Sequence, residues 1–117
     1  MPKVCHFEIP VEDPEKSIAF SSLVFGWTFQ KFGDENYWLI NTGPEDEPGI
    51  HGGLMKKNPG QPHTYVINVA DIDKSIADVK GAGGAIVLEK MEIPSVGFVA
   101  YFTDPDGIIT GLHQSFN

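Results

Sequence analysis

Two polar side chains near the start of the chain have the types and spacing for acid–base chemistry. His6 and Glu8 lie two residues apart and alternate with the apolar residues Phe7 and Ile9. In an extended strand, residues i and i+2 project from the same face, so both side chains could reach one ligand. Imidazole titrates near neutral pH, and burial raises the pKa of a glutamate, so the pair could exchange protons with a substrate. The alternative is a hydrogen-bonded pair without a chemical role.

The same alternation extends this polar face to other segments predicted as strands. Opposite the apolar positions that should pack on helices, it places five further side chains: His51, Met55, Thr64, Asn68 and His113. Together with His6 and Glu8 they form one face, which we expect to line the ligand cavity that the family resemblance given below implies. A metal site built from His6, Glu8 and the two later histidines is an open alternative.

Two aromatic residues are candidates for the walls of the same cavity. Trp38 and Tyr101 lie in the predicted third strands of two repeated units, and a spacing of 61 residues pairs them with Val99 and Ile40. On the cavity face they would favour a flat or apolar ligand, and on the helix face they would be core. Both options stay open, and we count the two residues among the candidate ligand-binding positions.

An internal repeat positions these residues. The segment Lys-Ser-Ile-Ala at 16–19 recurs at 74–77, 58 residues later, and the same spacing pairs Gly53 with Gly111. Repetition at a fixed spacing indicates two copies of one structural unit. We predict a single domain over residues 1–117, with units at about 1–57 and 63–117 and a linker at 58–62.

Each unit is predicted to run strand, helix and three strands. Asp13 is a good cap for a helix that starts at Pro14 and stops at Gly26, and Asp71 is a good cap for the second helix. The later strands are expected around residues 27–31, 37–41, 50–56, 85–90, 98–103 and 108–114. This order predicts an α+β fold.

Composition excludes several classes of partner. The chain has 8 basic and 16 acidic residues, and a nucleic-acid surface needs clustered Lys and Arg, so we exclude nucleic acid as the main partner. No apolar run approaches the length of a membrane span, so we expect no membrane partner. The single cysteine, Cys5, allows no disulfide within the chain, fits a cytoplasmic location, and is expected in the core.

Four motifs in this tandem layout carry a resemblance to a known superfamily. They are His-Phe-Glu-Ile-Pro at 6–10, Val-Phe-Gly-Trp at 24–27, Gly-Gly-Leu-Met at 52–55 and Tyr-Phe-Thr-Asp-Pro-Asp-Gly at 101–107. With them the chain resembles the vicinal oxygen chelate superfamily, which includes glyoxalase I, bleomycin-resistance proteins and extradiol dioxygenases. The resemblance implies a curved, cup-like mixed sheet with helices on the outside, formed within one chain or across a swapped dimer.

The resemblance also implies where a metal centre would lie. Members that hold a divalent metal use up to four ligands, and their positions correspond here to His6, Gly53, Thr64 and Gly111. Glycine has no side chain and a neutral threonine hydroxyl is a poor ligand, so only His6 is competent. We therefore expect no family metal centre and no other cofactor.

Three functions stay open. The one we favour is a metal-free protein of bleomycin-resistance type that binds a small organic molecule in the cup. The second is a superfamily enzyme (a lyase, isomerase, epimerase or dioxygenase) that uses His6 and Glu8 or a rearranged metal site. The third is an interaction module with a vestigial cup. The first helix is unusually apolar from Ile18 to Phe25, which favours a homodimer contact there.

Overall fold

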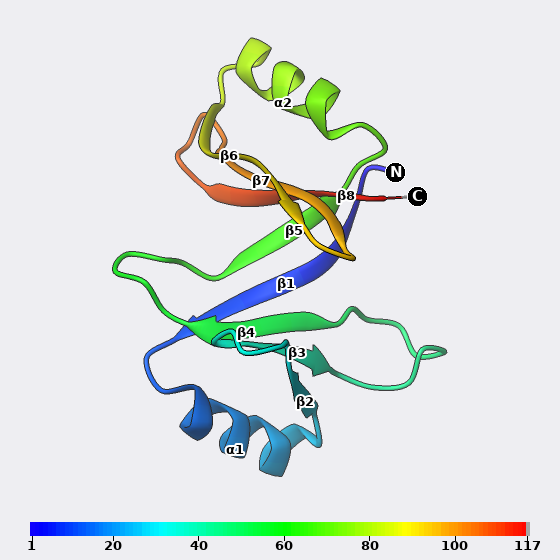
Figure 1. The fold of residues 1–117 in the computed structure, drawn as a ribbon, viewed down its shortest axis with the longest axis vertical. Helices are drawn as coiled ribbons and strands as arrows, with labels where there is room; N and C mark the ends of the chain where they lie inside the picture. The colour runs from blue at the N-terminus through cyan, green and yellow to red at the C-terminus, as the bar shows by residue number, and fades with distance from the viewer. Residues whose placement is uncertain (117) are drawn as a thin grey trace. The chain divides into compact units, whose positions relative to one another are not determined.

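The computed structural model describes residues 1–116. In chain order its elements are β1 (Lys3–Val11), α1 (Pro14–Phe25), β2 (Thr28–Lys31), β3 (Tyr37–Asn41), β4 (Gly52–Lys56), β5 (Thr64–Asn68), α2 (Ile72–Gly81), β6 (Ala85–Ile93), β7 (Gly97–Thr103) and β8 (Ile109–Ser115). The predicted order of strand, helix and three strands, given twice, is confirmed (Figure 1).

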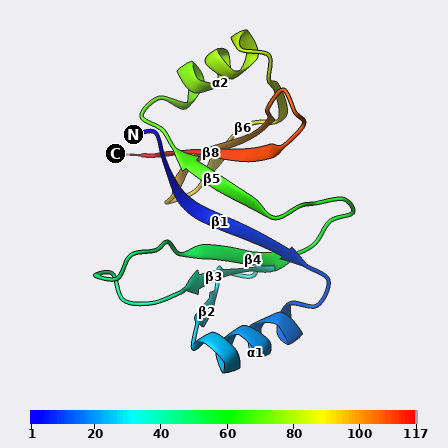
Figure 2. The same ribbon diagram turned by 180° about the vertical axis from the view of Figure 1, so that it is seen from behind.

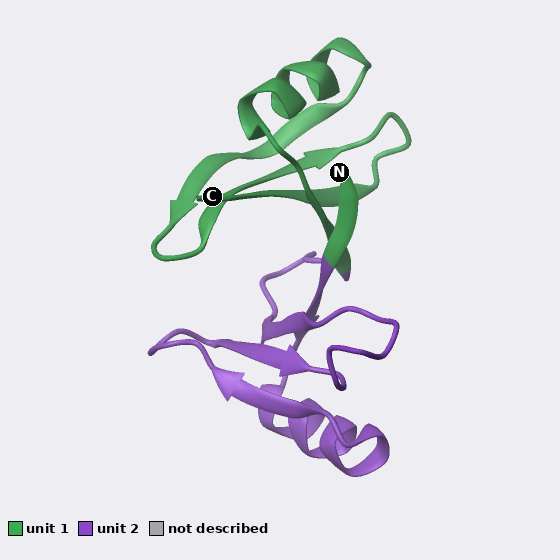
Figure 3. Ribbon diagram, turned by 90° about the vertical axis from the view of Figure 1, so that its right-hand side faces the viewer, with its two compact units in different colours: residues 1–5, 64–117 green, residues 6–63 purple. Residues whose placement is uncertain are grey.

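The chain divides into two compact units (Figure 3). The N-terminal unit, His6–His63, has its strands in the order β2-β3-β4-β1. The C-terminal unit joins Met1–Cys5 to the chain from Thr64 onward, and its strands run in the order β5-β8-β7-β6. In each unit the first strand pairs parallel with the last one and the remaining pairs are antiparallel, so the sheets are mixed. The α+β fold class is confirmed.

In each unit, the register of the parallel pair places residues of interest on one face of that unit's strands. Glu8 pairs with Gly53 in the N-terminal unit, and Asn68 pairs with His113 in the C-terminal unit. Directly paired residues project from the same face of a sheet. The opposite face of the N-terminal unit needs a glycine as well, because a Cβ on Gly52 would lie 2.5 Å from the ring of Phe7.

Both helices begin where the caps predict. The carboxylate of Asp13 accepts a hydrogen bond from the backbone N–H of Lys16, and Asp71 does the same for Lys74. Helix α1 ends at Gly26, whose φ of 71° lies in the left-handed region that glycine adopts without strain. Each helix lies along one side of the strands of its own unit (Figures 1 and 2).

The two helices differ in how they pack. In α2, Ile72 is fully buried in a core that includes Val69, Ala100 and Leu112. Helix α1 has no buried residue, and apolar side chains on it stay exposed: Phe20, Leu23, Val24 and Phe25. The core of the N-terminal unit instead contains Ile40 and Leu54.

The start of the chain departs from one prediction. Cys5 is exposed, which corrects its expected place in the core; its Sγ lies 3.7 Å from the carbonyl oxygen of Val66, to which the thiol donates. The residues of β1 up to Cys5 are all exposed, so the apolar residues near Cys5 do not indicate a buried segment. Neither helix within residues 1–116 has the length and apolarity to cross a membrane.

Candidate functional site

In the N-terminal unit, His6, Glu8 and Tyr37 form one hydrogen-bonded cluster. The hydroxyl of Tyr37 lies 2.9 Å from Nε2 of His6 and is also hydrogen-bonded to the carboxyl group of Glu8. Burial, followed by the negative charge of Glu8 and their hydrogen bond, raises the pKa of Tyr37 far above its usual value. The phenol therefore stays protonated and donates to Glu8, and its oxygen accepts from Nε2–H of His6.

A glycine makes room for this cluster. A Cβ built on Gly53 would collide with the hydroxyl group and the ring of Tyr37. Gly53 pairs with Glu8 on β1, so the space above the glycine lies on the face that carries the carboxylate. The absence of a side chain at Gly53 thus lets Tyr37 reach both polar partners.

Tyr37 is the functional candidate that the sequence reasoning missed. Tyr37 pairs with Met55 and Leu39 pairs with Gly53, which puts Tyr37 on the face of Glu8. Tyr101 pairs with Gly111 in the C-terminal unit, so Leu39 is its counterpart, at a spacing of 62 residues. The predicted spacing of 61 was wrong by one residue, and a spacing of 62 would have placed Tyr37 on the same face as Leu39.

The same correction moves Trp38. It pairs with Leu54, which pairs with Ile9, so Trp38 lies on the opposite face from Glu8 and Tyr37. The prediction that Trp38 and Tyr101 occupy equivalent faces is therefore wrong. Met55 pairs with Tyr37, is buried, and lies on the predicted face.

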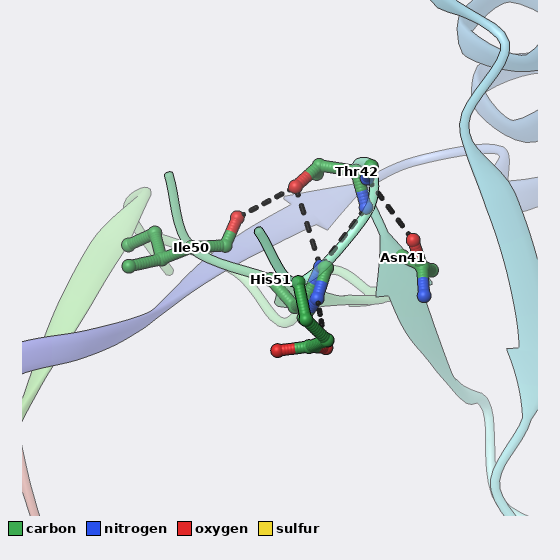
Figure 4. Close-up of polar contacts among 6 residues, drawn as sticks. Asn41, Thr42, Ile50 and His51 are labelled. Carbon is green, nitrogen blue, oxygen red and sulfur yellow. Dashed lines mark hydrogen bonds and ion pairs between the residues drawn. The ribbon is translucent and has the colours of Figure 1, made fainter. Parts of the chain in front are cut away.

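His51 braces the loop between β3 and β4 (Figure 4). Its Nδ1 accepts a hydrogen bond of 3.1 Å from the backbone N–H of Thr42, and its Nε2 lies 3.0 Å from a carboxylate oxygen of Glu45. Thr42 also donates from Oγ1 to the carbonyl of Ile50. Both ring nitrogens of His51 are thus engaged within the loop, and its place in a ligand cavity stays a prediction.

In the C-terminal unit, the predicted residues Asn68, Tyr101 and His113 share one face. Nδ1 of His113 lies 3.2 Å from Oδ1 of Asn68, and Tyr101 pairs with Gly111. A Cβ on Gly111 would lie 2.9 Å from Val66 and 3.0 Å from the ring of Tyr101, so these two side chains cover the glycine. Thr64 begins β5 and projects, by strand alternation, on the face of Asn68.

The His113 ring has an unusual environment. Its Nε2 is buried and has no hydrogen-bond partner, and burial lowers the pKa of the ring below its usual value. Within residues 1–116, no three His, Cys, Asp or Glu side chains gather closely enough to hold a metal ion. The structure therefore presents a His–Tyr–Glu cluster in one unit and a His–Asn pair in the other.

Comparison with known proteins supports a family assignment. Residues 3–43 match the family described as bleomycin resistance protein-like N-terminal. Over 105 residues the chain is 31% identical to "Putative glyoxylase CFP32" of Mycobacterium bovis, and the match covers 87% of this chain and 40% of that protein. The chain thus spans about two fifths of the length of the curated relatives it matches.

Solved structures share the fold at low sequence identity. A methylmalonyl-CoA epimerase from Mycobacterium tuberculosis has a TM-score of 0.71 at 15% identity, covering 97% of this chain and 88% of that one. A glyoxalase/bleomycin resistance protein/dioxygenase superfamily member from Vibrio splendidus has a TM-score of 0.70 at 18% identity, covering 98% and 100%. The chain belongs to the vicinal oxygen chelate superfamily.

The superfamily's metal positions do not fit a four-ligand centre in this chain. At Gly53 the side-chain space is taken by Tyr37, and at Gly111 it is taken by Tyr101 and Val66. Nε2 of His6 is already hydrogen-bonded to Tyr37, so a metal bound at this nitrogen would displace that hydrogen bond. The clusters described above replace the ligand set instead of completing it.

The close approach at Gly53 predicts a steric effect on stability. Gly53→Ala should lower the free energy of unfolding by roughly 1–3 kcal/mol, because the added methyl group overlaps Tyr37 and forces it from His6. Urea denaturation of the variant measures this loss. In a Tyr37→Ala background the same substitution should cost much less.

Gly81→Ala is the matched control, because nothing lies within 4 Å of its added methyl group and the residue is helical. It should be neutral or slightly stabilising. An equal loss at Gly53 in the two Tyr37 backgrounds would contradict the steric account.

Burial of His113 predicts a loss of stability in mild acid. A pKa lowered by folding means that the unfolded chain binds the proton more readily. The contribution of His113 is complete above the unfolded pKa of about 6.5 and declines as the pH falls through that value. The fall in unfolding free energy between pH 7 and 5 should be smaller in His113→Gln than in the unmodified protein.

His63→Gln is the control, because His63 is exposed. A change in the slope of stability against pH that appears in His113→Gln and not in His63→Gln is specific to the buried ring. NMR titration of His113 to a pKa at or above that of a histidine in a model peptide would contradict the expected shift.

Proposed function

We propose that this protein binds a small organic molecule on the face that carries His6, Glu8 and Tyr37, without the superfamily metal. The observation that carries the proposal is the hydroxyl of Tyr37, which fills the space of the absent ligand at Gly53 and bonds to Nε2 of His6. A neutral phenol between an imidazole and a carboxylate supplies hydrogen-bonding groups where relatives of the superfamily place a cation. Such convergent polar groups are typical of small-molecule sites.

The electrostatics of the cluster favour polar recognition over metal binding. Tyr37 keeps its proton because burial and the charge of Glu8 both oppose ionisation. A metal would need His6 to release the proton on Nε2 and would lose the hydrogen bond to Tyr37. The cluster therefore favours a ligand that binds to it through hydrogen bonds.

The homodimer and the cytoplasmic location stay predictions.

A ligand screen tests the proposal. Thermal shifts would be measured for a panel of aromatic acids, phenols and acyl-CoA thioesters against the unmodified protein, with calorimetry for each hit. For a ligand held by the cluster, His6→Ala and Tyr37→Phe should each weaken binding by roughly five- to tenfold, the usual effect of losing one hydrogen bond.

His63→Gln, at an exposed histidine outside the cluster, should bind as the unmodified protein does. Elemental analysis of protein purified without chelators adds an independent measurement. Stoichiometric nickel, zinc, iron or manganese that disappears in His6→Ala would refute the metal-free site. If a ligand binds to His6→Ala and Tyr37→Phe as tightly as to the unmodified protein, its site lies outside the cluster.

A second candidate function is acid–base catalysis by the same cluster. The observation in its favour is the continuous hydrogen-bonded chain from His6 through Tyr37 to Glu8, which links a base and an acid on one face. One solved structure of similar fold is named a methylmalonyl-CoA epimerase, and epimerisation moves a proton at carbon. At 15% identity this similarity concerns the fold, so the reaction is a proposal for this chain.

Proton exchange separates the enzyme from the binder. The protein would be incubated with methylmalonyl-CoA in D2O, and deuterium at the α-carbon would be followed by NMR. An acid–base enzyme for this substrate should incorporate deuterium, and Glu8→Gln and His6→Ala should each reduce the rate by about 10²-fold or more. Incorporation at the same rate in both variants would exclude the cluster as the catalyst.

A further inference from the structure

Helix α1 carries its largest apolar side chains on the side that faces solvent. Its half-buried positions follow the helical spacing of three and four residues, and two of the four are serines: Pro14, Ser17, Ile18 and Ser21. Outside this stripe, Phe20 is 60% exposed and Leu23 is 86% exposed. A surface helix ordinarily covers its apolar residues and exposes its polar ones, so α1 reverses the usual pattern.

Helix α2 shows that the fold does not require this reversal. A spacing of 58 residues aligns α2 with α1, and the positions that are not exposed then coincide, being in α2 Ile72, Ser75, Ile76 and Val79. At the outward positions, Asp78 stands where α1 has Phe20. Gly81 stands where α1 has Leu23. The carboxylate of Asp78 forms an exposed ion pair of 2.9 Å with Lys74, so the same helix face is charged in one unit and apolar in the other.

The apolar surface of α1 is large enough to form the centre of a protein–protein interface. Its four main side chains have exposed fractions between 52% and 86% and together expose roughly 500 Å²: Phe20, Leu23, Val24 and Phe25. Apolar patches of this size mark interaction sites. A stable dimer buries about 800 Å² on each partner. The patch therefore supplies more than half of one side of such an interface.

The charge near the patch favours a second copy of this chain as the partner. The chain has a net charge of -8 at pH 7, yet residues 17–30 contain no Asp, Glu, Lys or Arg. Two identical acidic chains repel each other least where they meet through a neutral face. A helix that lies on a membrane carries Lys and Arg along its polar face, whereas Lys16 is the one basic residue of α1.

We propose that two copies of this chain form a symmetric dimer by packing α1 against α1. In a two-fold arrangement each copy contributes the same patch, so Phe20 and Leu23 of both copies meet at the centre of the contact. The structure thus assigns particular outward residues to the homodimer that the apolar sequence of the helix predicts. The surface goes beyond the function proposed above, since His6, Glu8 and Tyr37 take no part in it.

Sedimentation equilibrium of the full chain tests the dimer. The unmodified protein should sediment with twice the 12.8 kDa mass of one chain. The dimer should become tighter as salt is added, because salt screens the repulsion between two acidic chains. Phe20→Asp should weaken it by about a hundredfold or more, because in a symmetric pair each substitution removes two side chains from the centre of the interface.

The second helix provides the design of this variant. Phe20→Asp gives α1 the residue that α2 has at the equivalent position, four residues after Lys16 just as Asp78 follows Lys74. The helix should therefore persist, which circular dichroism measures. The control is Val87→Asp, which places the same charge at a 53%-exposed valine on the edge strand β6 and should leave the dimer intact.

Four results would overturn the α1 contact. The first is a monomer at every concentration up to about 1 mM, whether or not it binds phosphatidylcholine vesicles. The second is a dimer that Phe20→Asp leaves unchanged. The third is a dimer that Val87→Asp abolishes, which locates the contact at the edge of β6. The fourth is a dimer that loosens as salt is added, which indicates a contact between opposite charges.

An NMR measurement decides the proposal even if Phe20→Asp does not fold. Isotope-labelled and unlabelled copies of the unmodified protein would be mixed, and magnetisation transfer between copies would be recorded. Transfer between the Phe20 ring of one copy and α1 of the other is expected, and a dimer without it has its interface elsewhere. Because His6, Glu8 and Tyr37 are unchanged throughout, these results are independent of ligand binding at the N-terminal cluster.

Discussion

The contact between the Tyr37 hydroxyl and Nε2 of His6, made above a glycine, organises the chemistry of the N-terminal unit. It requires Gly53 to have no side chain, while burial, more than any other cause, raises the pKa of Tyr37 and keeps its hydroxyl protonated. Through the second hydrogen bond of Tyr37 it also connects His6 to Glu8. The missing side chain at Gly53 thus gives the Tyr37 phenol its place between the imidazole of His6 and the carboxylate of Glu8.

Much of the fold follows from local signals in the sequence. Asp13 and Asp71 fix the starts of both helices through their own side chains, and Gly26 ends the first because of its left-handed backbone. These effects act within a few residues, so they are readable without tertiary structure. Because the second unit repeats the first, the order of elements predicted for one unit also applies to the other.

The site was less predictable because it depends on register. His6 and Glu8 are readable from alternation within one strand, but Tyr37 reaches them across two strand pairings. One residue of error in counting across the loop put Trp38 on the same face as Tyr101, since side chains alternate with a period of two. The role of His51 was hidden for a similar reason: its partners Thr42 and Glu45 lie in an irregular loop.

The hydrogen bonds of His51 across that loop support the alignment of β4 with β3. The loop between Asn41 and Gly52 joins β3 to β4. Its last residue, His51, is hydrogen-bonded to its first residue, Thr42. Because side chains alternate along a strand, a one-residue shift of β4 against β1 and β3 would turn Leu54 toward the face of Glu8 and Gly53 to the opposite face. The position of Gly53 under Tyr37 therefore depends on this register, which the pairing with β1 and the hydrogen bonds of His51 across the loop both support.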